Sequence, residues 1–240
     1  MSEGPTTAMI LAAGLGTRLR PLTATRPKPL VEVAGKPIID YGLDKLRAAG
    51  VSNAVVNLHY LGDQLQAHLQ SRKDFTFQFS HEPDGPLETG GGTQRALPML
   101  GSAPFFLING DSFWIDGAEP NFSRMSQLWD GSKMDILLLL AATVDAVGYK
   151  GLGDFDMDAD GRLRRRAEGR ATGFVYAGAA IFDPAIFASQ TEANYSLNKL
   201  FDLAIERDRL YGLRLDGIWL HISTPPDVGN AESAISHSVA

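Results

Sequence analysis

The sequence contains no cysteine, which excludes disulfide bonds and thiolate metal ligands. Its longest apolar run covers residues 136–142 and is far too short to span a bilayer. Residues 1–7 contain neither a positively charged stretch nor a long apolar one, so we expect no signal peptide. These absences together predict a cytoplasmic protein that does not bind a membrane.

The sequence also has no excess of positive charge. It has 22 Lys and Arg against 28 Asp and Glu, a net charge of −6, whereas proteins that bind nucleic acid usually present a basic surface. We therefore expect no nucleic-acid partner. An enzyme acting on nucleotides is not excluded, because it needs only a few cationic side chains in its site. The apolar and charged fractions, 44% and 21%, are typical of globular proteins.

Short apolar runs alternate with helical patterns in the first half of the chain. This alternation is typical of right-handed βαβ crossovers, so we predict an α/β fold with a Rossmann-like, mostly parallel central sheet flanked by helices. The second half is less regular, and we expect it to complete the same sheet within a single domain, residues 1–240. Strands are expected at about 8–13, 54–58, 75–79, 105–108, 135–142, 176–182, 210–215 and 218–221, helices at about 40–49, 63–70, 93–100, 197–206 and from 226, and a hairpin over 153–165.

The first apolar run leads into a glycine loop, Gly14-Leu15-Gly16-Thr17-Arg18. A loop of this kind at the carboxyl end of a strand exposes backbone N–H groups that can bind phosphates, and glycine lets the backbone approach an anion closely. The loop lacks the third glycine of a dinucleotide-binding GxGxxG and the GK[ST] of a P-loop, so we set an NAD-dependent oxidoreductase aside. Two glycines alone would equally suit an ordinary turn.

The glycine loop is followed by Arg-Pro-Lys-Pro-Leu, with Lys28 ten residues after Arg18. This combination resembles the signature of the sugar-1-phosphate nucleotidyltransferases, G-x-G-[ST]-R-[LM]-x-P-L-T followed by P-K-P-L. The resemblance implies the nucleotide-diphospho-sugar transferase fold, with a nucleotide-binding half at about 8–115 and a sugar-phosphate-binding half at about 116–235. It also implies that Arg18 stabilises the departing pyrophosphate and that Lys28 bridges the α-phosphate and the sugar phosphate. The nucleotide-binding positions that the resemblance implies in this region are Ala12, Gly14, Gly16 and Thr17.

Asn109-Gly110-Asp111 follows a buried apolar strand. A carboxylate at such a strand end can hold a metal ion over a triphosphate, although these residue types also suit a plain turn. The resemblance implies that Asp111 binds Mg²⁺.

Residues 86–92 contain three successive glycines, which we interpret as a loop that could contact a base or ribose. The string Leu-Glu-Thr-Gly-Gly-Gly resembles the bacterial N-acetylmuramate-1-phosphate uridylyltransferase branch, and it implies nucleotide contacts from Glu82, Thr89 and Gly90. A carboxylate at Glu82 could accept a hydrogen bond from uracil N3–H or two from guanine, so the base stays open.

The chain departs from the family pattern W-x-D-x-G-T-P, because His221 stands where relatives have an aspartate that binds a second metal. Neutral imidazole is a poor ligand for Mg²⁺ and suits Mn²⁺ better. Two interpretations stay open: a metal ligand, or a histidine hydrogen-bonded at a strand end.

Tyr-Ala-Gly at 176–178 resembles the segment that lines the sugar pocket of relatives. The basic run at 162–166 is expected to be a solvated hairpin face. The implied sugar-binding residues are Asn109, Gly153, Glu168 and Gly178.

The resemblance as a whole predicts transfer of a nucleotidyl group from a nucleoside triphosphate to a sugar 1-phosphate, with release of pyrophosphate and with Mg²⁺ as cofactor. The expected pair is UTP and N-acetylmuramate 1-phosphate, which would serve sugar nucleotide biosynthesis in peptidoglycan recycling. The alternatives are a mannose- or heptose-1-phosphate guanylyltransferase, or a non-catalytic sugar-nucleotide sensor of the same fold. A monomer or a small homo-oligomer is expected.

Overall fold

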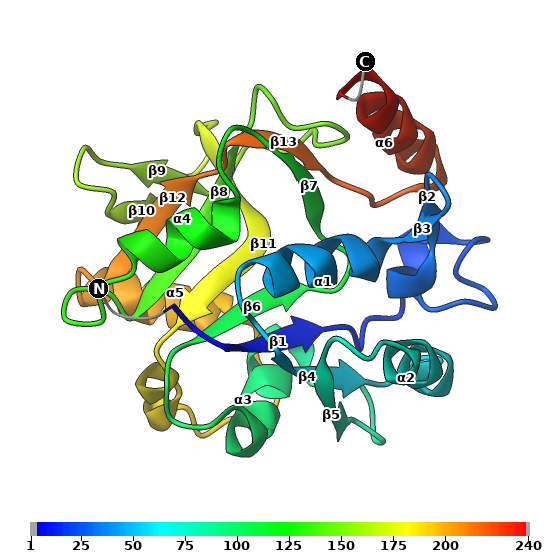
Figure 1. Ribbon diagram of the computed structural model, residues 1–240. Helices are drawn as coiled ribbons and strands as arrows, with labels where there is room; N and C mark the ends of the chain where they lie inside the picture. Colours follow the sequence, from blue (N-terminus) through cyan, green and yellow to red (C-terminus); the bar gives the residue numbers. More distant parts are fainter. Residues whose placement is uncertain (1–3, 239–240) are drawn as a thin grey trace.

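The computed structural model describes residues 4–238 (Figure 1). Residues 1–3, which begin the segment expected to carry no signal peptide, lie outside the described residues. No helix within residues 4–238 has the length and apolar character needed to cross a membrane.

The first half forms four parallel strands in the order β6-β1-β4-β5. These strands are β1 (Thr7–Leu11), β4 (Asn53–Leu58), β5 (Thr76–His81) and β6 (Phe105–Asn109). Three helices connect them: α1 (Ile38–Ala48), α2 (Gly62–Ser71) and α3 (Glu88–Leu100). α1 ends just before Gly50, whose φ of 89° suits glycine and stops the helix. The predicted Rossmann-like arrangement is confirmed.

The second half completes the same sheet, as the sequence predicts. β11 (Phe174–Phe182) runs antiparallel to β6 on one side and to β8 (Ile136–Ala142) on the other. β12 (Leu210–Arg214) pairs in parallel with β8, and the predicted hairpin is present as β9 (Phe155–Met157) and β10 (Leu163–Arg165). The nine strands therefore form one continuous sheet. Its four strands from the first half of the chain are parallel to one another.

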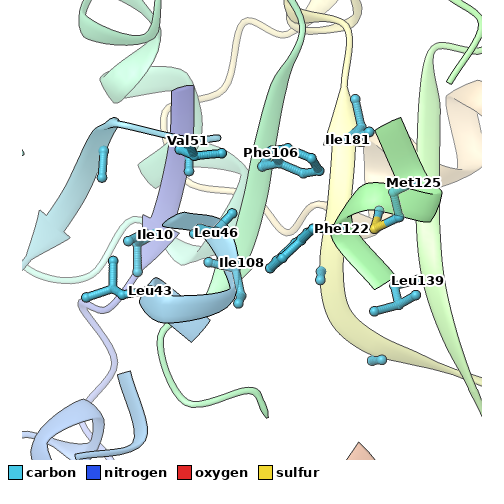
Figure 2. Packing of buried hydrophobic residues seen from close by; sticks show 14 of the residues in the cluster. Ile10, Leu43, Leu46, Val51, Phe106, Ile108, Phe122, Met125, Leu139 and Ile181 are labelled. Carbon is cyan, nitrogen blue, oxygen red and sulfur yellow. The ribbon is translucent and has the colours of Figure 1, made fainter. Parts of the chain in front are cut away.

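Helices cover both faces of this sheet, because successive side chains of a strand point to opposite faces. On one face, Ile10, Phe106 and Ile108 pack with residues of α1, α2 and α4 (Asn121–Leu128) (Figure 2). On the other face, Met9 and Phe105 pack with α3 and α5 (Asn198–Glu206), and a 3-10 helix at Pro184–Ser189 adds to this layer. Each face thus has its own apolar core.

A third, smaller core lies where the loops of the carboxyl edge meet. β7 (Phe113–Asp116) pairs with β13 (Gly217–Leu220), and β2 (Glu32–Val33) pairs with β3 (Lys36–Pro37). These ribbons pack with α6 (Pro225–Ser238) and with the 3-10 turn Thr17–Leu19 around Leu19, Val31 and Phe113. Val31 directly follows a second 3-10 turn, Lys28–Leu30. The sequence analysis missed β7 and α4. This core anchors the segments that carry Arg18 and Lys28.

Candidate active site

A cavity of about 470 Å³ lies at the carboxyl ends of β1, β4, β5 and β6. β1 is the point where the strand order reverses, because the chain passes from β1 outward to β4 and β5 and then returns to β6 on the other side of β1 (Figure 1). Open α/β sheets bind ligands at such points. The cavity is lined by residues 11–19, Lys28, Pro29, Asn57, Glu82, Pro86, Glu88, Thr89, Asn109, Asp111 and Ser223.

The glycine loop forms one wall of this cavity, with Ala12, Gly14, Gly16 and Thr17 among its lining residues. Gly16 has φ of 60°, and a Cβ there would lie 3.1 Å from the Thr23 side chain and 3.2 Å from Lys28. The carbonyl of Gly16 accepts a 2.8 Å hydrogen bond from Thr23 Oγ1. Glycine at this position therefore allows both the left-handed turn and the close packing that holds the loop.

Lys28 and Asp111 meet in the cavity. Lys28 Nζ donates to Asp111 Oδ2 at 2.6 Å, and the side chains are 14% and 36% exposed. A charge-assisted hydrogen bond of this length, partly shielded from water, fixes both groups. Arg18 also lines the cavity, and within residues 4–238 no hydrogen bond or ion pair engages its guanidinium. Two cations and one carboxylate thus share one site.

Glu82 lies on the cavity wall nearest to β5 but is only 2% exposed. One carboxylate oxygen accepts from Asn57 Nδ2 at 2.8 Å and the other from the Leu87 N–H at 2.8 Å. Asn57 Oδ1 in turn accepts from the Ala12 N–H at 2.7 Å. This chain of hydrogen bonds joins the ends of β1, β4 and β5 to the start of α3.

The three glycines of residues 90–92 lie in a helix, so the prediction of a loop over residues 86–92 is wrong from residue 88 onward. α3 begins at Glu88, and the N–H groups of Gly90 and Gly91 donate to the Tyr195 carbonyl at 2.8 and 3.0 Å. A Cβ at Gly90 would lie 2.4 Å from the Tyr195 ring. The glycines allow close helix packing. Gly90 itself does not line the cavity, whereas Thr89 does.

The predicted sugar-binding residues are only partly brought together. Asn109 lines the cavity, and Gly178 lies beside it, since a Cβ on Gly178 would be 3.0 Å from Asn109 Nδ2. Gly153 lies against Thr172, and Glu168 is exposed on a turn. Neither Gly153 nor Glu168 is among the residues that line the cavity.

The basic run of residues 162–166 is not the solvated face that the sequence suggested. Arg164 is exposed and the Arg162 side chain is 42% exposed, whereas Arg165 pairs with Asp202 at 2.6 Å and lies over the ring of Phe155. Arg166 Nε donates to the Gly153 carbonyl at 3.1 Å. The run therefore fixes the hairpin and the segment that carries Gly153.

His221 lies near the Lys28–Asp111 pair, just after β13. Its ring packs against the rings of Trp219 and, edge-on, Tyr149. The distances between ring centroids are 5.1 Å and 5.9 Å. Burial, and then the charge of Lys28, lower the pKa of His221 below its usual 6.5, so the ring is neutral at pH 7. Within the described part of the chain, the ring makes no hydrogen bond. This differs from the interpretation of His221 as a histidine hydrogen-bonded at a strand end.

Asp111 is the carboxylate best placed for a metal ion. Residues 4–238 bring no group of three His, Cys, Asp or Glu side chains together as metal ligands. Asp227 points elsewhere, because one of its oxygens accepts from the N–H groups of Ser223 and Thr224 at the start of α6. A single carboxylate is compatible with Mg²⁺, which in proteins binds through one or two carboxylates, with substrate phosphates and water as its other ligands.

The polar lining residues Asn57, Glu88 and Ser223 are absent from the predicted site residues. Asn57 gave one usable signal, a polar residue at the end of an otherwise apolar strand. Glu88 gave none, because its place depends on where α3 begins.

Comparisons with known proteins agree with this geometry. The family model "Nucleotidyl transferase" matches residues 7–238. The chain is 41% identical to an N-acetylmuramate alpha-1-phosphate uridylyltransferase of Caulobacter vibrioides, covering 99% of this chain and 100% of the relative. A protein of the same name from Neisseria meningitidis serogroup B is 36% identical, over 90% and 93% of the two chains. A crystal structure of UDP-glucose pyrophosphorylase with UDP-glucose has a TM-score of 0.80 at 17% identity, over 98% and 99%, which shows a shared fold.

Proposed function

This chain belongs to the nucleotidyl transferase family, and we propose that it transfers UMP from UTP to N-acetylmuramate α-1-phosphate. The expected family of sugar-1-phosphate nucleotidyltransferases is confirmed. The observation that carries the proposal is the Lys28–Asp111 pair beside the glycine loop, in a chain that matches a uridylyltransferase along its whole length. A mannose-1-phosphate guanylyltransferase subunit of Drosophila pseudoobscura pseudoobscura is 30% identical, and this chain covers 60% of it, so guanylyl transfer is less supported.

The reaction is an attack by a phosphate oxygen of the sugar 1-phosphate on the α-phosphorus of UTP. The new O–P bond forms as the bond from the α-phosphorus to the bridging oxygen breaks, and pyrophosphate leaves with the electron pair. No covalent enzyme intermediate is required, so the chain contributes positioning and stabilisation of charge.

Each cation has a proposed part in that charge stabilisation. The backbone N–H groups of the loop at Gly14, Gly16 and Thr17 bind phosphate oxygens, and the guanidinium of Arg18 stabilises the departing pyrophosphate. Lys28, held in the cavity by Asp111, bridges the α-phosphate and the incoming sugar phosphate. Preorganised donors of this kind act without reorganising during the reaction.

We propose Mg²⁺ as the cofactor, bound by Asp111 together with phosphate oxygens. When bound, Mg²⁺ supplies positive charge that neutralises the crowded phosphates. If His221 also acts as a ligand, Mn²⁺ suits the site better, because imidazole is a softer donor than carboxylate.

The remaining proposed contacts divide between the two halves of the chain. Residues 8–115 bind the nucleotide, with Ala12, Glu82 and Thr89 on the nucleoside side, and residues 116–235 contribute to the sugar site. The sugar contacts proposed at the cavity are Asn109 and Gly178, whereas Gly90, Gly153 and Glu168, which the sequence also suggested as contacts, do not line it. The product would serve peptidoglycan recycling in the cytoplasm.

The test is pyrophosphate release by the purified protein with Mg²⁺, repeated with Mn²⁺. UTP, GTP, dTTP and CTP are each combined with the 1-phosphates of N-acetylmuramate, glucose, mannose and a heptose. We expect release chiefly with UTP and N-acetylmuramate α-1-phosphate. Release chiefly with GTP and mannose or heptose 1-phosphate would establish the guanylyltransferase instead, and binding without any release would establish a sensor.

A further inference from the structure

Glu88 adopts a backbone conformation that side chains disfavour. Its φ is 58°, in the left-handed region, and it is the first residue of α3. Glycine occupies this region without cost, whereas glutamate loses stability there through the clash of its Cβ with the backbone. Such residues persist where the surroundings dictate the conformation, and they cluster at functional sites.

The surroundings do dictate the turn at Glu88. The preceding N–H, of Leu87, is held by Glu82, and the N–H groups of Gly90 and Gly91 are held by the Tyr195 carbonyl. The chain must therefore turn sharply between two fixed points. These anchors explain the left-handed backbone, but they do not explain a glutamate side chain at the turn.

The side chain of Glu88 is exposed and lines the cavity. Within residues 4–238, its carboxylate takes part in no hydrogen bond or ion pair. Glu82 is the contrasting case, because it is buried and both of its oxygens already accept a hydrogen bond from the protein. Three carboxylates thus line the cavity: Asp111, which is paired with Lys28, Glu82, which is fixed in the wall, and Glu88, which is available to a ligand.

The position of Glu88 shows which part of a nucleotide it meets. It follows β5, whereas Asp111 and its partner Lys28 lie at the end of β6, and β4 and β1 stand between these strands. Neighbouring strands are about 4.8 Å apart, so the ends of β5 and β6 are separated by about 14 Å. A carboxylate would repel phosphates, which belong beside the cations. Glu88 therefore faces the nucleoside.

We propose that Glu88 determines nucleotide specificity, its carboxylate accepting a hydrogen bond from an N–H or O–H donor of the nucleoside. The donor is the N3–H of uracil or a ribose hydroxyl. This inference rests on the proposed function only in placing a nucleotide in the cavity. Cytosine, which has an acceptor at N3, would be rejected if the donor is on the base.

Glu88→Gly separates a ligand contact from a structural role. Glycine relieves the strain of the left-handed backbone, so we expect the melting temperature to stay the same or rise. The Kd for UTP should rise about 10- to 100-fold, measured by calorimetry with Mg²⁺ and without sugar phosphate. Glu88→Gln keeps an acceptor oxygen but loses the charge, so a smaller loss is expected. Asp208→Gly is the matched control, because Asp208 is exposed, has φ of 55° and lies outside the cavity. It should show the thermal effect without the change in Kd.

UTP analogues identify the donor. The analogues are 2′-deoxy-UTP, 3′-deoxy-UTP and N3-methyl-UTP, and the wild type should lose about tenfold or more in affinity for the one that lacks the donor. Glu88→Gly should lose nothing further for that analogue. Equal losses in both proteins for every analogue, or a Glu88→Gly Kd equal to that of the wild type, would overturn the inference.

These outcomes are distinct from failure of the proposed function. If the wild type binds GTP in place of UTP, uridylyl transfer fails, and the same comparison of Glu88→Gly with the wild type is made with GTP. If the wild type binds none of the four nucleotides, both statements are overturned.

Discussion

The side-chain amide of Asn57 donates a 2.8 Å hydrogen bond to the carboxylate of Glu82, and α3 packs directly on that bond through Gly92. A Cβ on Gly92 would lie 2.7 Å from Glu82 Oε1 and 2.8 Å from Asn57 Nδ2. Both atoms are buried and already bonded, so neither can move away freely. The absence of a side chain at Gly92 is therefore a condition for the geometry of the cavity wall.

Gly92→Ala should destabilise the protein by about 1–3 kcal/mol, because the new methyl group overpacks a buried site. For a chain of this size, that corresponds to a fall in melting temperature of several degrees, which calorimetry would measure. Gly229→Ala is the matched control, since Gly229 also lies in a helix and a Cβ there meets no atom within 4 Å. The control should be neutral or stabilising. Equal melting temperatures for the two variants would contradict the packing argument.

Lys28→Ala should lower the turnover number by two orders of magnitude or more. Loss of one preorganised donor to a transition state costs about 2.7–4 kcal/mol of barrier, and Lys28 is the cation held in the centre of the cavity by Asp111. The measurement is steady-state pyrophosphate release, with circular dichroism to show that the fold is intact. Lys199→Ala removes an exposed lysine paired with Glu192 and should leave the rate unchanged. A fully active Lys28→Ala variant would refute the assignment of Lys28.

Asp111→Asn should raise the Mg²⁺ concentration needed for half-maximal activity, since a neutral amide is a weaker ligand for Mg²⁺ than a carboxylate. The measurement is a Mg²⁺ titration at saturating substrates. Lys28 loses its ion-pair partner in the same variant, so the maximal rate should fall as well. A decrease in rate with an unchanged Mg²⁺ requirement would mean that Asp111 acts only by positioning Lys28.

The lowered pKa of Asp116 predicts that the free energy of unfolding decreases at acid pH. Burial alone would raise the pKa of Asp116, but hydrogen bonds from Lys45, the Asn121 N–H and the Trp114 indole lower it below the usual 3.8. Its stabilising effect is therefore complete above pH 3.8 and is lost as the pH falls through the lowered pKa.

Urea unfolding of the wild type and of Asp116→Asn tests this. The free energies of unfolding should differ by about 1–3 kcal/mol at neutral pH and converge below pH 3.8. Asp160→Asn, at an exposed carboxylate paired with Arg162, should show almost no difference at any pH. A difference for Asp116→Asn that is constant from pH 7 to pH 3 would contradict the prediction.

The sequence predicts those parts of the fold and site whose signals are local. A dozen residues or fewer suffice to predict each of three segments: the apolar run before Gly14, the glycine loop itself and the strand before Asp111. The strand order then brings Asp111 to Lys28. The start of α3 could not be predicted from local sequence in this way. Successive glycines usually weaken a helix, and only the distant Tyr195 and Glu82 show why a helix contains them here.

Long-range pairing also limits what the sequence predicts. β7 was missed because its partner β13 lies about a hundred residues further on, and no short motif marks either strand as half of a ribbon. The same limit applies to Glu88, whose left-handed conformation follows from anchors at Glu82 and Tyr195.

The position of β11 has a mechanical consequence. This strand is hydrogen-bonded to β6 on one side and to β8 on the other, so the backbone ladder joins the strands of the first half of the chain to those of the second, with one register shift between Tyr176 and Ala180. A hinge between the two sides would have to break that ladder. We therefore expect the sheet to behave as a stiff plate during turnover, with substrate entry and product escape governed by the loops above its carboxyl edge. Amide hydrogen exchange should accordingly be slow in β6, β11 and β8 whether or not substrates are bound.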